Sequence, residues 1–238
     1  MRLVLAILLL SVLAGAAIDQ TYIQTITSNG NSMIEKTMEL SIFSDQITND
    51  TLVRMSGVCN KQPNLGCSVD VNKKKVIVSQ SFISGDYYVY STDYGFPSIT
   101  KKLTISKIPT DKFSSSLERL LLAANATNQS GGVVRPIDLR DKKTNTENAK
   151  YLRLLKANIT YIVNMPSVIA EAKAGNVSGM IDKTSAQFDL VSVLEVSEPI
   201  VIKSSEPNWS YIIGLFGVIV LIGVSFSFFG SKPVKKRK

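Results

Sequence analysis

Histidine is absent from all 238 residues of the sequence. Its absence excludes Ser-His-Asp and Cys-His catalytic sites, zinc sites with histidine ligands and switches based on imidazole protonation. The sequence also lacks a Gly-x-Ser-x-Gly elbow, a phosphate-binding loop and a dinucleotide fingerprint. Catalysis by carboxylates, serine or lysine stays open, but we expect a protein that is not an enzyme and that needs no metal and no cofactor.

Cysteine is nearly as scarce, with only Cys59 and Cys67 in the chain. The residues between them, 60–66, include Pro63, Asn64 and Gly66 and are typical of a turn. In an oxidising compartment, two thiols that flank a turn predict a disulfide that closes a hairpin loop. The alternative is a redox pair, which favours closer spacing and a helix N-terminus.

Excess positive charge is confined to the two ends of the chain. The formal net charge is +8, but Arg2 and five cations near the C-terminus account for six of the 27 Lys and Arg residues. The remaining 21 cations face 19 carboxylates, so the middle of the chain is close to neutral. We therefore expect no nucleic-acid partner.

The N-terminus has the pattern of a secretory signal peptide. Arg2 precedes an apolar run from Leu3 to Leu13, and small residues follow at 14–17. The run is too short to cross a bilayer, which takes about 20 residues. We expect residues 1–17 to be removed as a signal peptide; the alternative is an uncleaved anchor.

Residues 211–229 form the one long stretch without charge, and they predict a transmembrane helix over 209–230. Trp209 and Tyr211 at its start are typical of a membrane interface. The cations that follow it predict a basic cytoplasmic tail over 231–238: Lys232, Lys235, Lys236, Arg237 and Lys238. We expect a single-pass type I protein of the cell membrane with its N-terminal domain outside. The tail also resembles a dilysine retrieval signal, although a plain membrane anchor accounts for the same residues.

The segment 18–208 predicts an α+β fold, a mainly antiparallel β-sheet with one or two packed helices. Helices are expected over 112–125 and, with a weaker pattern, over 144–156. A possible boundary between lobes lies near 126–134, and residues 204–208 read as a short linker to the membrane. Short runs rich in β-branched and aromatic residues predict strands, over 33–43, 52–58, 76–82, 87–90, 99–108, 159–165, 168–172, 180–182, 188–193 and 199–203.

Tyrosines gather in one predicted strand and its turn. Tyr87, Tyr88, Tyr90 and Tyr94 are possible contacts for a sugar or a lipid headgroup, because a tyrosine ring has an apolar face and a polar tip. Strand alternation sends about half of such residues into a core, so ordinary packing is the alternative. The basic run 73–75 also has two interpretations, a contact with an anionic surface or a solvated hairpin turn.

Asparagine occurs in six Asn-x-Ser/Thr sequons, which makes the chain a candidate glycoprotein. The candidate glycosylation sites are Asn49, Asn125, Asn128, Asn158, Asn176 and Asn208.

The last third of the domain resembles the LppM-like family of exported, membrane-anchored domains over about residues 157–205. Ser167 stands where that family usually has glycine, and a tryptophan often found within 183–187 is missing. The resemblance implies a curved sheet around a helix, lipid or glycolipid binding at the cell envelope and no catalytic residues. The segments that carry it are 161–166, 168–169, 174–176, 179, 188–190 and 200–202.

Together these features predict a membrane-anchored envelope protein whose extracytoplasmic domain binds membrane lipid, a glycan or an envelope protein without catalysis. The alternative is a structural or assembly subunit of a membrane complex. An enzyme is the third possibility.

Overall fold

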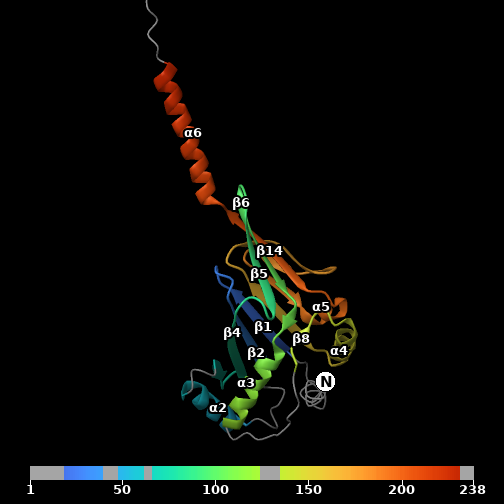
Figure 1. Cartoon of the computed structure of the whole chain (residues 1–238). Coiled ribbons are helices and arrows are strands. Elements are labelled where there is room, and N and C mark those ends of the chain that lie inside the picture. The colour runs from blue at the N-terminus through green and yellow to red at the C-terminus, as the bar shows by residue number, and fades with distance from the viewer. Residues whose placement is uncertain (1–18, 40–47, 62–65, 124–134, 231–238) are drawn as a thin grey trace, which may run out of the picture.

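The computed structural model describes residues 19–39, 48–61, 66–123 and 135–230 (Figure 1). The expected signal peptide, the lobe boundary near 126–134 and the basic tail lie outside these residues. The described fold is α+β with mostly antiparallel sheets, as the sequence predicts.

The larger sheet has seven strands. Its order is β12 (Met180–Asp182), β13 (Ser185–Asp189), β9 (Asn158–Asn164), β1 (Asp19–Ile26), β2 (Ser32–Glu39), β4 (Lys75–Phe82) and β3 (Cys67–Asp70). All neighbours are antiparallel except β1 and β9, which pair in parallel from Asp19 with Asn158 to Thr25 with Asn164. This parallel pair joins the start of the domain to its last third.

The second sheet has five strands and is antiparallel throughout. Its order is β11 (Val177–Ser178), β10 (Val168–Ala174), β14 (Ile200–Pro207), β6 (Ser98–Ile105) and β5 (Tyr88–Tyr94). Two short strands, β7 (Lys107–Ile108) and β8 (Ile137–Asp138), form a separate pair. The basic run 73–75 lies at the turn between β3 and β4, in agreement with the hairpin alternative.

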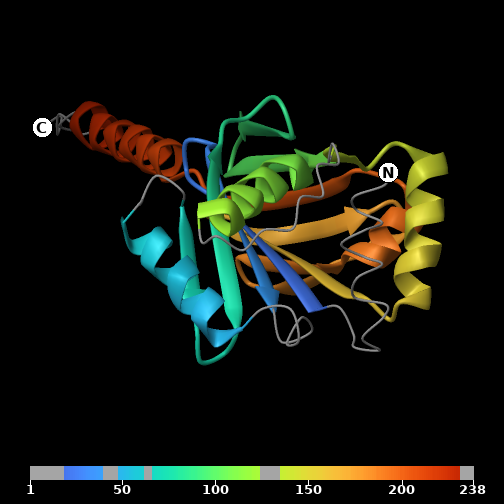
Figure 2. The ribbon, with the colours of Figure 1, turned by 90° about the horizontal axis from the view of Figure 1, so that it is seen from below.

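Buried side chains from both sheets form one core cluster. The helix α3 (Thr110–Ala123) contributes Phe113 and Leu120 to this core, so the predicted helix over 112–125 is present and packs on the sheet. The second predicted helix is α4 (Lys142–Leu154), capped by the Asp141 side chain. Figure 2 shows α3 lying across the strands between α2 and α4, which stand at opposite ends of the domain.

Two helices stand where the sequence predicts strands. Residues 52–58 belong to α2 (Asn49–Lys61), in which Leu52, Met55 and Cys59 form one buried helical face. The Thr48 hydroxyl accepts a hydrogen bond from the Thr51 amide and starts this helix. The strand prediction was wrong because the β-branched residues in this short window outweighed the helical spacing.

The predicted strand 188–193 is also wrong beyond its first two residues. β13 ends at Asp189, whose carboxylate accepts a hydrogen bond from the Val191 amide and caps α5 (Leu190–Val196). The domain therefore has four helices in its described residues where one or two were expected, followed by α6 (Trp209–Gly230).

The junction before α6 is a second difference from the prediction. Residues 204–207, expected as a linker, continue β14 up to Pro207, and their partners on β6 are the residues 98–101. α6 begins two residues later, so no flexible linker separates the sheet from the C-terminal helix.

Candidate functional site

The predicted tyrosine contacts do not share one surface. Tyr88 is fully buried, and its hydroxyl donates to the carbonyl oxygens of Gly30 and Phe82 at 2.9 and 3.1 Å. Tyr87 is half-buried with its ring edge-on to Phe82. Desolvation raises the pKa of both phenols, Tyr87 and Tyr88. Tyr88 is therefore a core residue, and Tyr87 packs against the core.

Tyr90 and Tyr94 lie further along β5, toward the loop that connects it to β6. The Tyr90 ring is half-buried against Gly30, where an added Cβ would lie 2.6 Å from a ring carbon, and Gly30 has a φ of +84°. Only glycine fits this hairpin turn between β1 and β2 without strain. Tyr94, by contrast, is 76% exposed. Of the four tyrosines, Tyr94 is the one with a largely exposed side chain.

Tyr94 belongs to a group of exposed aromatic side chains where the β5–β6 hairpin meets α6. This group, called here the aromatic tip, consists of Tyr94, Phe96, Trp209 and Tyr211. The Phe96 and Tyr211 rings lie 5.4 Å apart, centroid to centroid. Figure 1 shows the hairpin beside the first turns of α6 and pointing the same way as the helix.

Asn208 fixes the hairpin to α6. Its side-chain amide donates to the Gly95 carbonyl oxygen at 3.0 Å, and its backbone amide donates to the Pro97 carbonyl oxygen at 2.9 Å. Its side-chain oxygen accepts from the Tyr211 amide at the start of the helix. One residue thus ties the loop between β5 and β6 to the first turn of α6.

Behind the tip, an ion pair joins β6 to β14. The Lys101 ammonium lies 2.8 Å from a Glu206 carboxylate oxygen, and the Lys101 side chain is only 8% exposed. Ser98 and Lys101 also have the Ser-x-x-Lys spacing of some acyltransferases. On an extended strand two residues three apart point to opposite faces, so they form no nucleophile and base pair here.

The apolar side chains of α6 are exposed along the helix, from Ile213 to Val224. The structure describes these side chains as far as residue 225. Among the residues that are described with their side chains, no helix is both long enough and apolar enough to cross a membrane.

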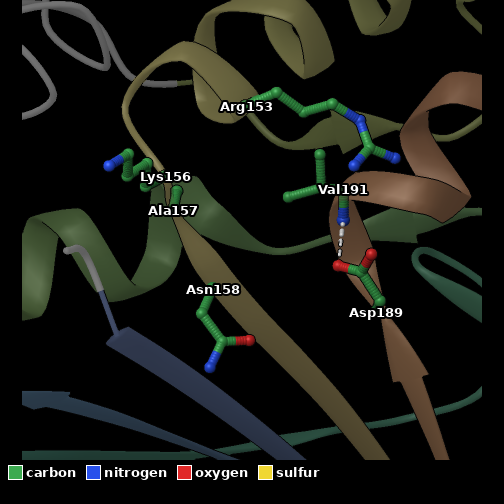
Figure 3. Close-up of a pocket in the computed structure, with 6 residues that line it drawn as sticks. All are labelled: Arg153, Lys156, Ala157, Asn158, Asp189 and Val191. Carbon is green, nitrogen blue, oxygen red and sulfur yellow. Dashed lines mark hydrogen bonds between the residues drawn. The ribbon is translucent and has the colours of Figure 1, made fainter.

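A shallow pocket of about 430 Å³ lies where α4, β9 and α5 meet (Figure 3). Its lining residues are Arg153, Lys156, Ala157, Asn158, Asp189 and Val191. Arg153 forms a bidentate ion pair with Glu195, which raises the pKa of Arg153 and lowers that of Glu195. Asp189 is engaged as the cap of α5, and Figure 3 shows Arg153 and Lys156 pointing in opposite directions. These groups do not converge on one point, so the pocket lacks the arrangement of a catalytic site.

A second charged group lies on the five-stranded sheet. Glu171 forms ion pairs with Lys173 and Lys203 at 2.5 and 2.7 Å. Hydrogen bonds from these lysines lower the pKa of Glu171 to about 2. The described residues hold no group of His, Cys, Asp and Glu side chains that could bind a metal ion.

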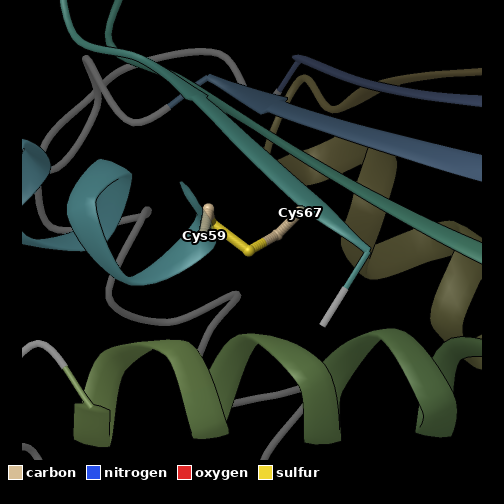
Figure 4. The surroundings of a disulfide bond; sticks show 2 residues. All are labelled: Cys59 and Cys67. Carbon is tan, nitrogen blue, oxygen red and sulfur yellow. A yellow bond between two sulfur atoms is a disulfide. The ribbon is translucent and has the colours of Figure 1, made fainter. Parts of the chain in front are cut away.

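The predicted disulfide between Cys59 and Cys67 is present, with 5.4 Å between the two Cα atoms. The sequence predicted that this disulfide closes a hairpin loop, but the two cysteines do not lie on the two strands of a hairpin. Figure 4 shows that it joins the end of α2 to the start of β3, so it holds that helix against the sheet edge.

The sequons have different surroundings. Asn49, Asn158 and Asn176 are exposed, and Asn176 lies in the turn between β10 and β11. Asn208 is 9% exposed, and its amide nitrogen is already bonded to Gly95. Asn125 and Asn128 lie outside the described residues, as do the five cations of the tail.

No family model, no curated protein and no solved structure matches this chain. The resemblance to the LppM-like family therefore stays a prediction.

Proposed function

We propose that the chain is a single-pass membrane protein, with α6 in the bilayer and the α+β domain outside. The observation that carries this proposal is the exposure of the apolar side chains from Ile213 to Val224, on a helix that follows β14 without a linker. A helix that is apolar on every side is normally buried, and the domain does not bury this one. The hydrocarbon core of a lipid bilayer is an environment that suits the apolar surface of α6.

The length of α6 is consistent with this role. The helix continues to Gly230, past residue 225, the last one whose side chain is described, and its 22 residues contain no Asp, Glu, Lys or Arg. At about 1.5 Å per residue such a helix is about 33 Å long, and the hydrocarbon core of a bilayer is about 30 Å thick. The basic tail after it favours a cytoplasmic C-terminus.

We further propose that the domain binds a lipid, a glycan or an envelope protein at the membrane surface, without catalysis. Phe113 and Leu120 of α3 fill the space over the sheet, each 1% exposed, so a ligand would meet the outer surface and not the interior beneath this helix. The exposed aromatic side chains near α6 favour a lipid partner. The resemblance to LppM-like domains points the same way.

A specific observation also favours the alternative, a subunit of a membrane complex. Met180 and Ile181 are 75% and 41% exposed on β12, which is an edge strand of the seven-stranded sheet. An edge with exposed apolar side chains can pair with a strand of another chain. This edge is the candidate contact for a polypeptide partner.

Native mass spectrometry of the full chain, extracted from its own envelope in detergent, separates the two functions. Stoichiometric lipid that stays bound to both the wild type and a Met180→Ser, Ile181→Ser variant supports lipid binding. A polypeptide that is bound by the wild type and lost from this variant supports the subunit function. Recovery of the protein in the soluble fraction, without membrane, would refute both.

A further inference from the structure

We propose that the aromatic tip inserts into the headgroup region of the outer leaflet beside α6, so that the domain contacts the bilayer through a second element. The partner of the β5–β6 hairpin is then the lipid surface itself. This inference rests on the proposed membrane span of α6, and it adds that the domain is docked on the membrane and not merely tethered to it.

The depth of the tip follows from its contact with α6. Tyr211 is the third residue of the helix, so it lies at the membrane interface if the helix crosses the bilayer. The Phe96 ring packs on the Tyr211 ring at 5.4 Å, which places the loop of the hairpin at the same depth. Tyr94 is the last residue of β5 and precedes Phe96 by two residues, so it lies at nearly the same depth.

The tip cannot swing away from the helix without breaking several contacts. β6 pairs with β14 along the full length of both strands, from Ile200 with Ile105 to Pro207 with Ser98. The hydrogen bonds of Asn208 to Gly95 and Pro97 close the far end of this ladder. The hairpin and the start of α6 therefore move as one unit.

The chemistry of the tip suits the interfacial region. Residues 94–97 are Tyr-Gly-Phe-Pro and carry no charge. Tyr94 and Phe96 are 76% and 58% exposed, and Trp209 and Tyr211 are similarly exposed. Tyrosine and tryptophan are enriched at the membrane interface because the ring lies among apolar atoms while its polar atom stays hydrated. In water, these four large rings would stay mostly exposed to solvent.

Fluorescence quenching by brominated lipids tests the depth directly, because Trp209 is the single tryptophan of the chain. The full chain is reconstituted into phosphatidylcholine vesicles that contain lipids brominated near the top of the acyl chains. Two test variants carry Trp209→Phe together with Tyr94→Trp or Phe96→Trp. The matched control carries Trp209→Phe with Tyr151→Trp, since Tyr151 is 53% exposed on α4, which Figure 2 shows on the opposite side of the domain from α6.

The inference predicts that both test variants lose emission to a similar extent as the wild type and shift to shorter wavelength in vesicles, while the Tyr151→Trp control does neither. If Trp209 of the wild type is quenched but neither test variant is, the tip lies above the membrane and this inference fails, while the proposed span stands. If Trp209 is not quenched and the chain does not pellet with the vesicles, both the span and the docked tip are refuted.

Discussion

Replacing Phe113 with alanine tests how α3 is held on the sheet. The Phe113 side chain is 1% exposed and contacts two aromatic rings, Tyr22 at 5.9 Å and Phe82 at 6.5 Å between centroids. Truncating a buried phenylalanine to alanine usually costs about 3–5 kcal/mol, because apolar contacts are lost and a cavity remains. The higher helix propensity of alanine returns about 0.5 kcal/mol, so we expect a net loss of about 2.5–4.5 kcal/mol.

The assay is urea unfolding of the full chain in mild detergent, followed by near-ultraviolet circular dichroism of the buried aromatic residues. The loss is read from the shift in midpoint at an unchanged slope. A domain of this size loses about 2–4 °C of melting temperature per kcal/mol, so we expect a fall of roughly 5–18 °C. The control Tyr151→Ala removes an exposed ring from α4 and is expected to change stability by less than about 0.5 kcal/mol.

A loss below about 1 kcal/mol for Phe113→Ala, with the slope unchanged, would contradict the packing described above. It would mean that α3 does not share the core of the sheets, and that the space beneath it is open to a ligand.

Three further outcomes are expected. Replacing both Cys59 and Cys67 with serine costs about 2.5 kcal/mol in the same urea assay, from the entropy of closing a short loop; an unchanged midpoint would mean that α2 is held by its packing alone. The folded-state pKa of Glu171 lies below its ordinary value, so the contribution of its carboxylate to stability is complete above pH 5 and fades as the pH falls through 4.5 toward about 2. The melting-temperature difference between the wild type and Glu171→Gln should therefore close over this range. A difference that persists at pH 2 would argue against the ion pairs. In a host with an oligosaccharyltransferase, Asn176→Gln should remove one glycan mass and Asn208→Gln none, since the Asn208 amide is buried; a glycopeptide that contains Asn208 would contradict its bonded geometry.

The sequence was informative where one local pattern dominated. The spacing of Leu117 and Leu120 predicts a helix, and both residues pack on the core. The alternation from Ile159 to Met165 predicts a strand, and β9 covers most of that run. The two thiols predict their disulfide, because no other cysteine competes for either of them.

The sequence was misleading where a cap decides the local structure. The side chains of Thr48 and Asp189 start α2 and α5 in windows whose β-branched residues favour strands. Each cap residue is visible in the sequence, so an N-cap followed by helical spacing was the available signal.

Long-range pairing is not readable from a local window. The parallel pairing of β1 with β9 joins residues more than a hundred positions apart. The contact between the β5–β6 hairpin and α6 is of the same kind: Phe96 and Tyr211 carry no local sign that their rings will meet. The tyrosine pattern led to this hairpin, but burial separates Tyr94 from the core tyrosines, and burial depends on the whole fold.

Cysteine labelling in intact cells tests the central claim, that α6 crosses the membrane and leaves the domain outside. Cys59 and Cys67 are joined in a disulfide, so single cysteines can be added as Ser28→Cys in the exposed turn after β1 or as Ser231→Cys after α6. A membrane-impermeant maleimide should label the Ser28→Cys variant in intact cells and the Ser231→Cys variant only after the cells are permeabilised. Equal labelling of both variants in intact cells, or of neither, would contradict the membrane span.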